Sequence, residues 1–170
     1  MNEAFIKGTK ILESLEIPYF LTGGTFLGIK RDGHLIEWDE DIDVDVLAED
    51  MTPDKIKALS EMTNKFHAGN ADTLQPGHLA FFPNEIRFDI FCLHRKNGKR
   101  FRNYSHNNCM WFDEKFYNEP FEYLEYNNKK YKVPSPQVEW LEFFYGKDWN
   151  KPDKTWNWGK ANNICNIKDI

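Results

Sequence analysis

Apolar residues recur along the chain with two different periods, and these periods predict where helices and strands form. Where they return every third or fourth position, the spacing is typical of a helix with one buried face. We expect such helices at residues 3–16, 52–66 and 136–145, and a shorter one at residues 25–31, directly after Gly23 and Gly24. Pro18 ends the first helix and Gly146 closes the last.

Alternating residues and short apolar runs predict strands instead. We expect strands at residues 19–22, 41–47, 78–82, 86–93, 121–126 and 130–133. Asn127 and Asn128 favour a hairpin between the last two strands, and Asn97-Gly98 is typical of a hairpin turn, although its flanks are basic. The sequence therefore predicts an α+β fold, a mixed β-sheet flanked by helices, followed by a polar, tryptophan-rich surface wrap at residues 147–170.

Length and composition narrow the class of protein. The 170 residues suit one domain, residues 1–170, and 14 Phe, 7 Tyr and 6 Trp supply enough apolar area for a core. The net charge is -5 and no block of Lys and Arg occurs, which argues against a nucleic-acid partner. We see no apolar leader and no run of about 18 apolar residues, so we expect a cytoplasmic protein without a membrane span.

Cys92, Cys109 and Cys165 are widely spaced and odd in number. No Cys-x-x-Cys pair is present, so the pattern favours neither a zinc site nor a disulfide framework. We expect three free thiols in a reducing compartment.

Residues 41–47 carry the most distinctive pattern, because acidic and apolar residues alternate there. On a strand, the apolar side chains of Ile42, Val44 and Val46 would face the core. The acidic side chains would share the opposite face: Asp41, Asp43 and Asp45. One interpretation is a solvated edge strand. The other is a divalent cation site, because carboxylate oxygens are preferred Mg²⁺ ligands and a cation would offset their repulsion. An EF-hand is excluded, since it would require Gly where Val46 stands.

Two other features could complete such a site. Gly23 and Gly24 end a strand and open a helix, so backbone N–H groups could approach a phosphate there, and Thr25 could add a hydroxyl or cap the helix. The alternative is an ordinary tight turn. Asp89 lies in an apolar strand and would join the cluster if that strand pairs beside residues 41–47; otherwise it is a buried acid partnered by Arg87.

The combined motifs resemble the LicD/fukutin family, which has a nucleotidyltransferase fold. Residues 23–31 read Gly-Gly-Thr-Phe-Leu-Gly-Ile-Lys-Arg, and residues 36–44 read Ile-Glu-Trp-Asp-Glu-Asp-Ile-Asp-Val. The order continues with Phe-Asp-Ile-Phe at residues 88–91, Val-Pro-Ser at 133–135 and Tyr-Gly at 145–146. The resemblance spans residues 18–146 and implies a minimal nucleotidyltransferase fold.

The resemblance also implies an activity: transfer of a phosphorylated group, phosphocholine or a polyol phosphate, from a CDP-linked donor such as CDP-choline or CDP-ribitol to a glycan hydroxyl. By position, Asp41, Asp43 and Asp89 would hold Mg²⁺ or Mn²⁺, with Asp89 a ligand or the base for the acceptor hydroxyl. The residues implied for donor phosphate are Gly23, Gly24, Thr25 and Arg31. Trp38 would stack on a nucleobase or choline, or belong to the core.

Two other functions stay open on the sequence. A nucleotidyltransferase would hand over a nucleoside monophosphate instead, and a silent fold would act as a binding module. The clustered carboxylates disfavour a binding module, which does not require them. Smaller roles are also open: Asp45 could tune the metal or face solvent, and His78 and Arg87 could contact phosphate or lie on the surface.

Overall fold

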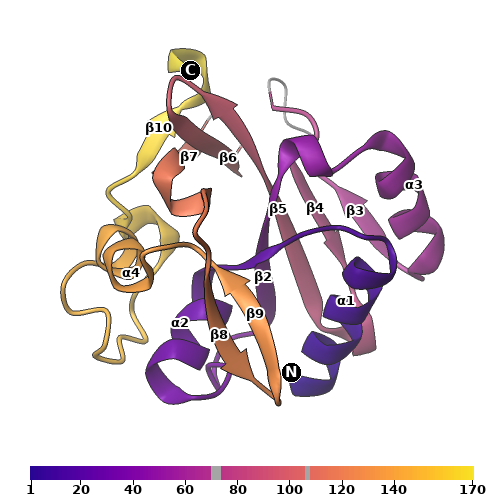
Figure 1. Cartoon of the computed structure of the whole chain (residues 1–170), viewed down its shortest axis with the longest axis horizontal. Coiled ribbons are helices and arrows are strands. Elements are labelled where there is room, and N and C mark those ends of the chain that lie inside the picture. The colour runs from indigo at the N-terminus through magenta and orange to yellow at the C-terminus, as the bar shows by residue number, and fades with distance from the viewer. Residues whose placement is uncertain (70–73, 106–107) are drawn as a thin grey trace.

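A computed structural model describes residues 1–69, 74–105 and 108–170, and its centre is an eight-stranded mixed sheet. The main path runs β1 (Phe20–Leu21), β2 (Asp41–Leu47), β5 (Arg87–Lys96), β6 (Lys99–Ser105), β7 (Asn108–Asp113) and β10 (Ile164–Asn166). The branch from β5 consists of β4 (His78–Phe81) and β3 (Phe66–Ala68). β2 and β5 are parallel and the other pairs are antiparallel, as Figure 1 shows. The predicted mixed sheet is confirmed.

Within the described residues, four α-helices and a separate hairpin surround this sheet: α1 (Asn2–Ser14), α2 (Gly23–Asp32), α3 (Pro53–Met62), α4 (Gln137–Tyr145), and β8 (Glu122–Tyr126) with β9 (Lys129–Val133). In Figure 1, α1 and α3 lie on the side of β3 and β4, and α2 and α4 lie on the other side. The side chains of Ile42, Val44 and Val46 are fully buried, as their alternation predicts. None of the helices in the described ranges is long and apolar enough to cross a membrane.

The predicted elements differ from the structure mainly at their ends. α3, predicted to run to Phe66, ends at Met62, because Thr63 turns the backbone to an extended conformation and residues 66–68 pair with β4 instead. α2 begins at Gly23, two residues earlier than predicted. Asn97 and Gly98 do form a hairpin turn, with φ angles of 51° and 72°, and β6 follows it.

The expectation of three free thiols is wrong. Cys109 and Cys165 form a disulfide, which links β7 to β10, and only Cys92 is a free, buried thiol. The two cysteines are 56 residues apart in sequence but directly opposite each other in the antiparallel β7–β10 pair. Their spacing along the chain therefore carried no signal of the bond.

Candidate metal and phosphate site

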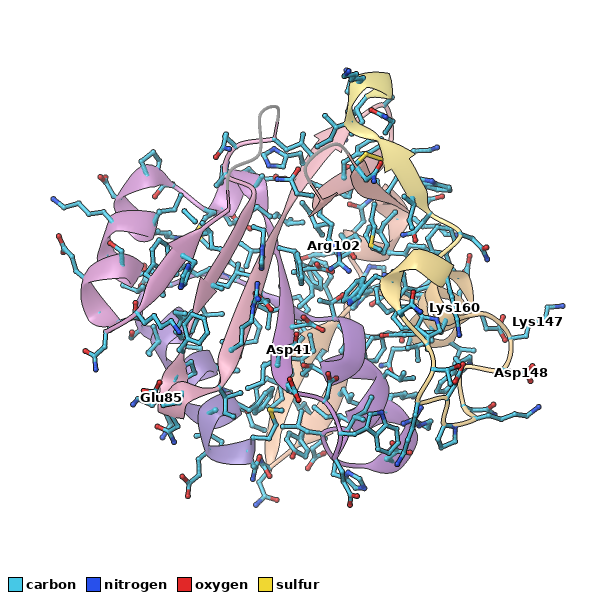
Figure 2. The ribbon with its side chains drawn as sticks, turned by 180° about the vertical axis from the view of Figure 1, so that it is seen from behind. Asp41, Glu85, Arg102, Lys147, Asp148 and Lys160 are labelled. Atoms are coloured by element: carbon cyan, nitrogen blue, oxygen red, sulfur yellow. A yellow bond between two sulfur atoms is a disulfide. The ribbon has the colours of Figure 1, made fainter. Side chains whose placement is uncertain are left out.

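Three aspartates converge where β2 and β5 lie side by side. The parallel register sets Asp43 opposite Asp89, and Asp41 begins the same strand. One carboxylate oxygen from each lies within 4.8 Å of the other two. Figure 2 shows Asp41 beside α2. β2 lies between β1 and β5, so the alternative of a solvated edge strand is excluded.

Burial and mutual repulsion hold these acids in an unfavourable state. Asp43 is 3% exposed, and burial followed by the charges of Asp41 and Asp89 raises its pKa well above the usual range. Asp39 joins the cluster from the preceding loop: burial and its contact with Asp41 raise its pKa to about 7. Burial also raises the pKa of Asp41. A bound cation would relieve this repulsion directly.

Asp89 belongs to the acid cluster and is also a buried acid with partners of its own. Both alternatives that the sequence offered for Asp89 therefore hold. His78 Nε2 lies 2.5 Å from Asp89 Oδ1, and Arg87 Nε donates to the same oxygen at 2.9 Å. His78 is itself stacked on Phe91, with ring centroids 4.8 Å apart. These contacts orient the carboxylate, and the second oxygen has no protein donor among the described contacts. His78 and Arg87 thus hold the Asp89 carboxylate in one orientation through its Oδ1 atom.

The glycine turn packs directly against the acids. Gly24 N donates to Asp43 Oδ2 at 3.3 Å, and Asp43 N donates to the Thr25 hydroxyl at 2.8 Å. Gly23 has a positive φ of 56°, and a Cβ there would lie 2.2 Å from Asp43 Oδ2. A Cβ on Gly24 would lie 2.1 Å from Asp39 Oδ2. Only glycines allow α2 to begin this close to the carboxylates, and Thr25, 2% exposed, holds the β2 backbone.

A cleft of about 400 Å³ opens in front of the acids. Asp39, Asp41 and Asp43 lie on one wall, together with Gly24 and the predicted phosphate ligand Arg31. The Arg31 side chain is only 6% exposed and its guanidinium is paired with Asp32 at 2.6 Å, so its charge is held in place. Trp38, which is 43% exposed, also lines this cleft, so it is not a core residue.

The opposite wall comes from the chain after α4, and sequence reasoning missed its part in the site. Residues 147–158 do not simply wrap the surface, because several of them line the cleft. The aromatic members of this wall are Trp149, Trp156 and Trp158, together with Tyr145 at the end of α4. Their density in a polar segment was the available signal. Other large aromatic residues lie elsewhere: Phe112, Tyr117 and Trp140 are core residues, and Trp111 lines a separate surface pocket.

Asp45 does not face solvent, which corrects one of the two roles expected for it. It is fully buried, and Arg102 Nη1 donates to its Oδ1 at 2.5 Å, while the Tyr117 hydroxyl donates to its Oδ2 at 2.9 Å. The Arg102 guanidinium lies over the ring of Phe91, with its central carbon 4.3 Å from the centroid. The strand's third acid therefore belongs to an internal ion pair.

Comparison with known proteins identifies the class to which this fold and site belong. Residues 16–136 match the family described as LicD/FKTN/FKRP, nucleotidyltransferase domain. The match covers most of the chain, so the chain belongs to this family, as its motifs predicted. The match also confirms the nucleotidyltransferase type of the fold.

Two curated relatives with the same name show how similar this chain is to known proteins. Ribitol-5-phosphate transferase FKTN of Mus musculus is 30% identical over 166 residues, or 88% of this chain and 33% of that protein. The Homo sapiens protein of the same name is 27% identical over 169 residues. The chain thus spans about a third of the length of these relatives. A candidate nucleotidyltransferase from Thermotoga maritima, known from a crystal structure, matches with a TM-score of 0.47 and 18% identity over 82% of this chain and 81% of that one.

Proposed function

We propose that this domain transfers a phosphorylated group from a CDP-linked donor to a glycan hydroxyl, with Mg²⁺ as cofactor. The observation that carries the proposal is the convergence of Asp41, Asp43 and Asp89, of which Asp41 and Asp43 line the cleft. Membership of the LicD/FKTN/FKRP family supports the reaction class, and relatives named ribitol-5-phosphate transferases support a phosphorylated group as the cargo.

The residues present fit a hard divalent cation. Three carboxylates offer oxygens to one point, and Mg²⁺ prefers carboxylates combined with waters and substrate phosphates. Mn²⁺ accepts the same oxygen ligands. When bound, the metal would neutralise negative charge on a donor diphosphate and on the oxygens of the transferred group. We assign Asp89 as a ligand rather than a base, because His78 and Arg87 already orient its carboxylate.

Other residues position the reactants. Gly24 N holds the Asp43 carboxylate through its hydrogen bond, so the turn shapes the metal site itself. Arg31 lies in the cleft with its charge fixed by Asp32 and would contact donor phosphate. Phosphoryl transfer needs positioning and charge stabilisation more than covalent help, and a cation on the three aspartates together with Arg31 would supply the charge stabilisation.

The test is ³¹P NMR of the protein with Mg²⁺ and a panel of CDP-choline, CDP-ribitol, CDP-glycerol and CTP. We expect the phosphorus signals of a CDP-linked donor to shift or broaden, and the effect to disappear in EDTA and in Asp43→Asn. Asp54→Asn, which removes an exposed acid on α3, is the matched control and should behave as the wild type.

Two outcomes would contradict the proposal. A response to CTP alone, with release of pyrophosphate when an acceptor is added, would favour transfer of a nucleoside monophosphate. No response to any nucleotide, with or without metal, would favour a silent binding module.

A further inference from the structure

The exposed ring of Trp38 is in contact with a cationic side chain of the protein itself. The Lys154 ammonium lies 4.6 Å from the centroid of the Trp38 ring, and both side chains line the cleft. Trp38 belongs to the loop before β2, whereas Lys154 belongs to residues 147–158 on the opposite wall. The contact therefore joins the two walls of the cleft. Lys154 also lies outside residues 16–136, the part that the family shares with this chain.

The other charges of this part of the cleft are compensated locally. Lys151 is paired with Asp148 at 2.7 Å, and Asp153 accepts from the Thr155 hydroxyl at 2.7 Å and lies 3.8 Å from Lys160 Nζ. Arg31 is paired with Asp32. Within the described residues, the Lys154 ammonium has no carboxylate or hydrogen-bond partner and lies over the Trp38 ring. The cleft thus holds one uncompensated ammonium, placed on its most exposed aromatic ring.

We infer that Lys154 is a specificity-determining residue that excludes a cationic transferred group and admits an uncharged polyol phosphate. The inference deepens the proposed function and rests on it. A trimethylammonium group is recognised by aromatic faces stripped of other cations. On Trp38 it would have to displace the ammonium of Lys154 or lie beside a like charge. Asp39, the acid adjacent to Trp38, is engaged with Asp41 in the metal cluster and does not offset that charge.

A polyol chain meets the same surroundings favourably. Its hydroxyl oxygens accept hydrogen bonds from an ammonium, which has three donors and no acceptor. Its C–H edges can pack on the ring faces of the aromatic wall. The same lysine therefore repels one class of donor and binds the other, which is how paired attraction and repulsion produce specificity.

Calorimetric titration of CDP-ribitol, CDP-choline and CMP into the full chain with Mg²⁺ tests this inference. We expect the wild type to bind CDP-ribitol at least about fivefold more tightly than CDP-choline. Lys154→Met should reduce this ratio about five- to tenfold, mainly by strengthening CDP-choline binding, and Lys154→Arg should retain it. Lys147→Met is the control: it removes the same charge from the same segment, but Lys147 points away from the cleft (Figure 2) and should not alter the ratio.

The outcomes separate this inference from the proposed function. Equal affinities for the two CDP compounds in the wild type, or an unchanged ratio in Lys154→Met, would overturn the role of Lys154 while leaving donor binding intact. If neither CDP compound nor CMP binds, the proposed function fails and the inference fails with it.

Discussion

Asp43 and Asp45 lie two residues apart on one face of β2, yet their carboxylates have opposite surroundings. Asp45 is matched by a buried guanidinium and a phenol, so its charge is compensated inside the protein. Asp43 receives one backbone N–H and lies among other carboxylates. At the residue scale, Asp45 is part of the folded core, whereas, among the described residues, the charge of Asp43 is not compensated by a cationic side chain in contact with it.

This contrast predicts opposite effects on stability for the same substitution. In EDTA at pH 7, Asp43→Asn should raise the free energy of unfolding by about 1–3 kcal/mol, because it removes a repelled, buried charge. Asp45→Asn should lower it by about 3–5 kcal/mol, because Arg102 would keep a buried, unpaired charge. Urea denaturation of both variants measures the difference. A destabilised Asp43→Asn would show that the acids are compensated without a metal.

At the scale of elements, packing between α1 and β5 explains a glycine that helix propensity disfavours. Gly8 lies in the middle of α1 and faces Phe88 on β5. A Cβ at Gly8 would lie 2.3 Å from two carbons of the Phe88 ring. The helix therefore lies against the sheet at a distance that only a residue without a side chain permits.

Gly8→Ala should consequently destabilise the protein, although a Gly-to-Ala change within an exposed helix usually stabilises by about 1 kcal/mol. We expect the free energy of unfolding to fall by about 1–3 kcal/mol from overpacking. Adding Phe88→Leu should recover part of this loss, since the smaller side chain frees space. If the Gly8→Ala variant were more stable than the wild type, that result would contradict this packing.

Element prediction succeeded where the apolar pattern was local and failed where partners were distant. The β8–β9 hairpin was predicted because asparagine tolerates the positive φ angles that such turns require. Asn127 and Asn128 do adopt positive φ angles. β6 was missed because its inward residues include Arg100 and Arg102, which are 4% and 1% exposed. Charged residues in a strand pattern indicate a solvent-facing side unless their partners are known, and the partner of Arg102 lies 57 residues away.

At the scale of the whole molecule, the Cys109–Cys165 disulfide ties the end of the chain back to the sheet. The loop it closes contains α4 and residues 147–158, which form the aromatic wall of the cleft. The bond thus closes the loop that contains the segment facing the acid cluster, and it limits how far that segment can move from the sheet.

Cys165→Ser should lower the free energy of unfolding by about 2–4 kcal/mol, because it removes a constraint on a long loop. Urea denaturation with and without dithiothreitol gives the measurement and its control. Reductant should lower the stability of the wild type toward that of the variant and leave the variant unchanged. Equal stability of wild type and variant without reductant would contradict a restraining role.

The family, the mixed fold and the candidate acids of the cluster were predictable from the amino-acid sequence alone. Those features are written in short motifs, because strand alternation and a glycine turn act over a few residues. The folded structure, in contrast, sets which acids stay in the cluster, since Asp45 pairs with Arg102 on β6. It also decided that residues 147–158 face the cleft and that the two cysteines pair, because such contacts depend on long-range packing that no local pattern encodes.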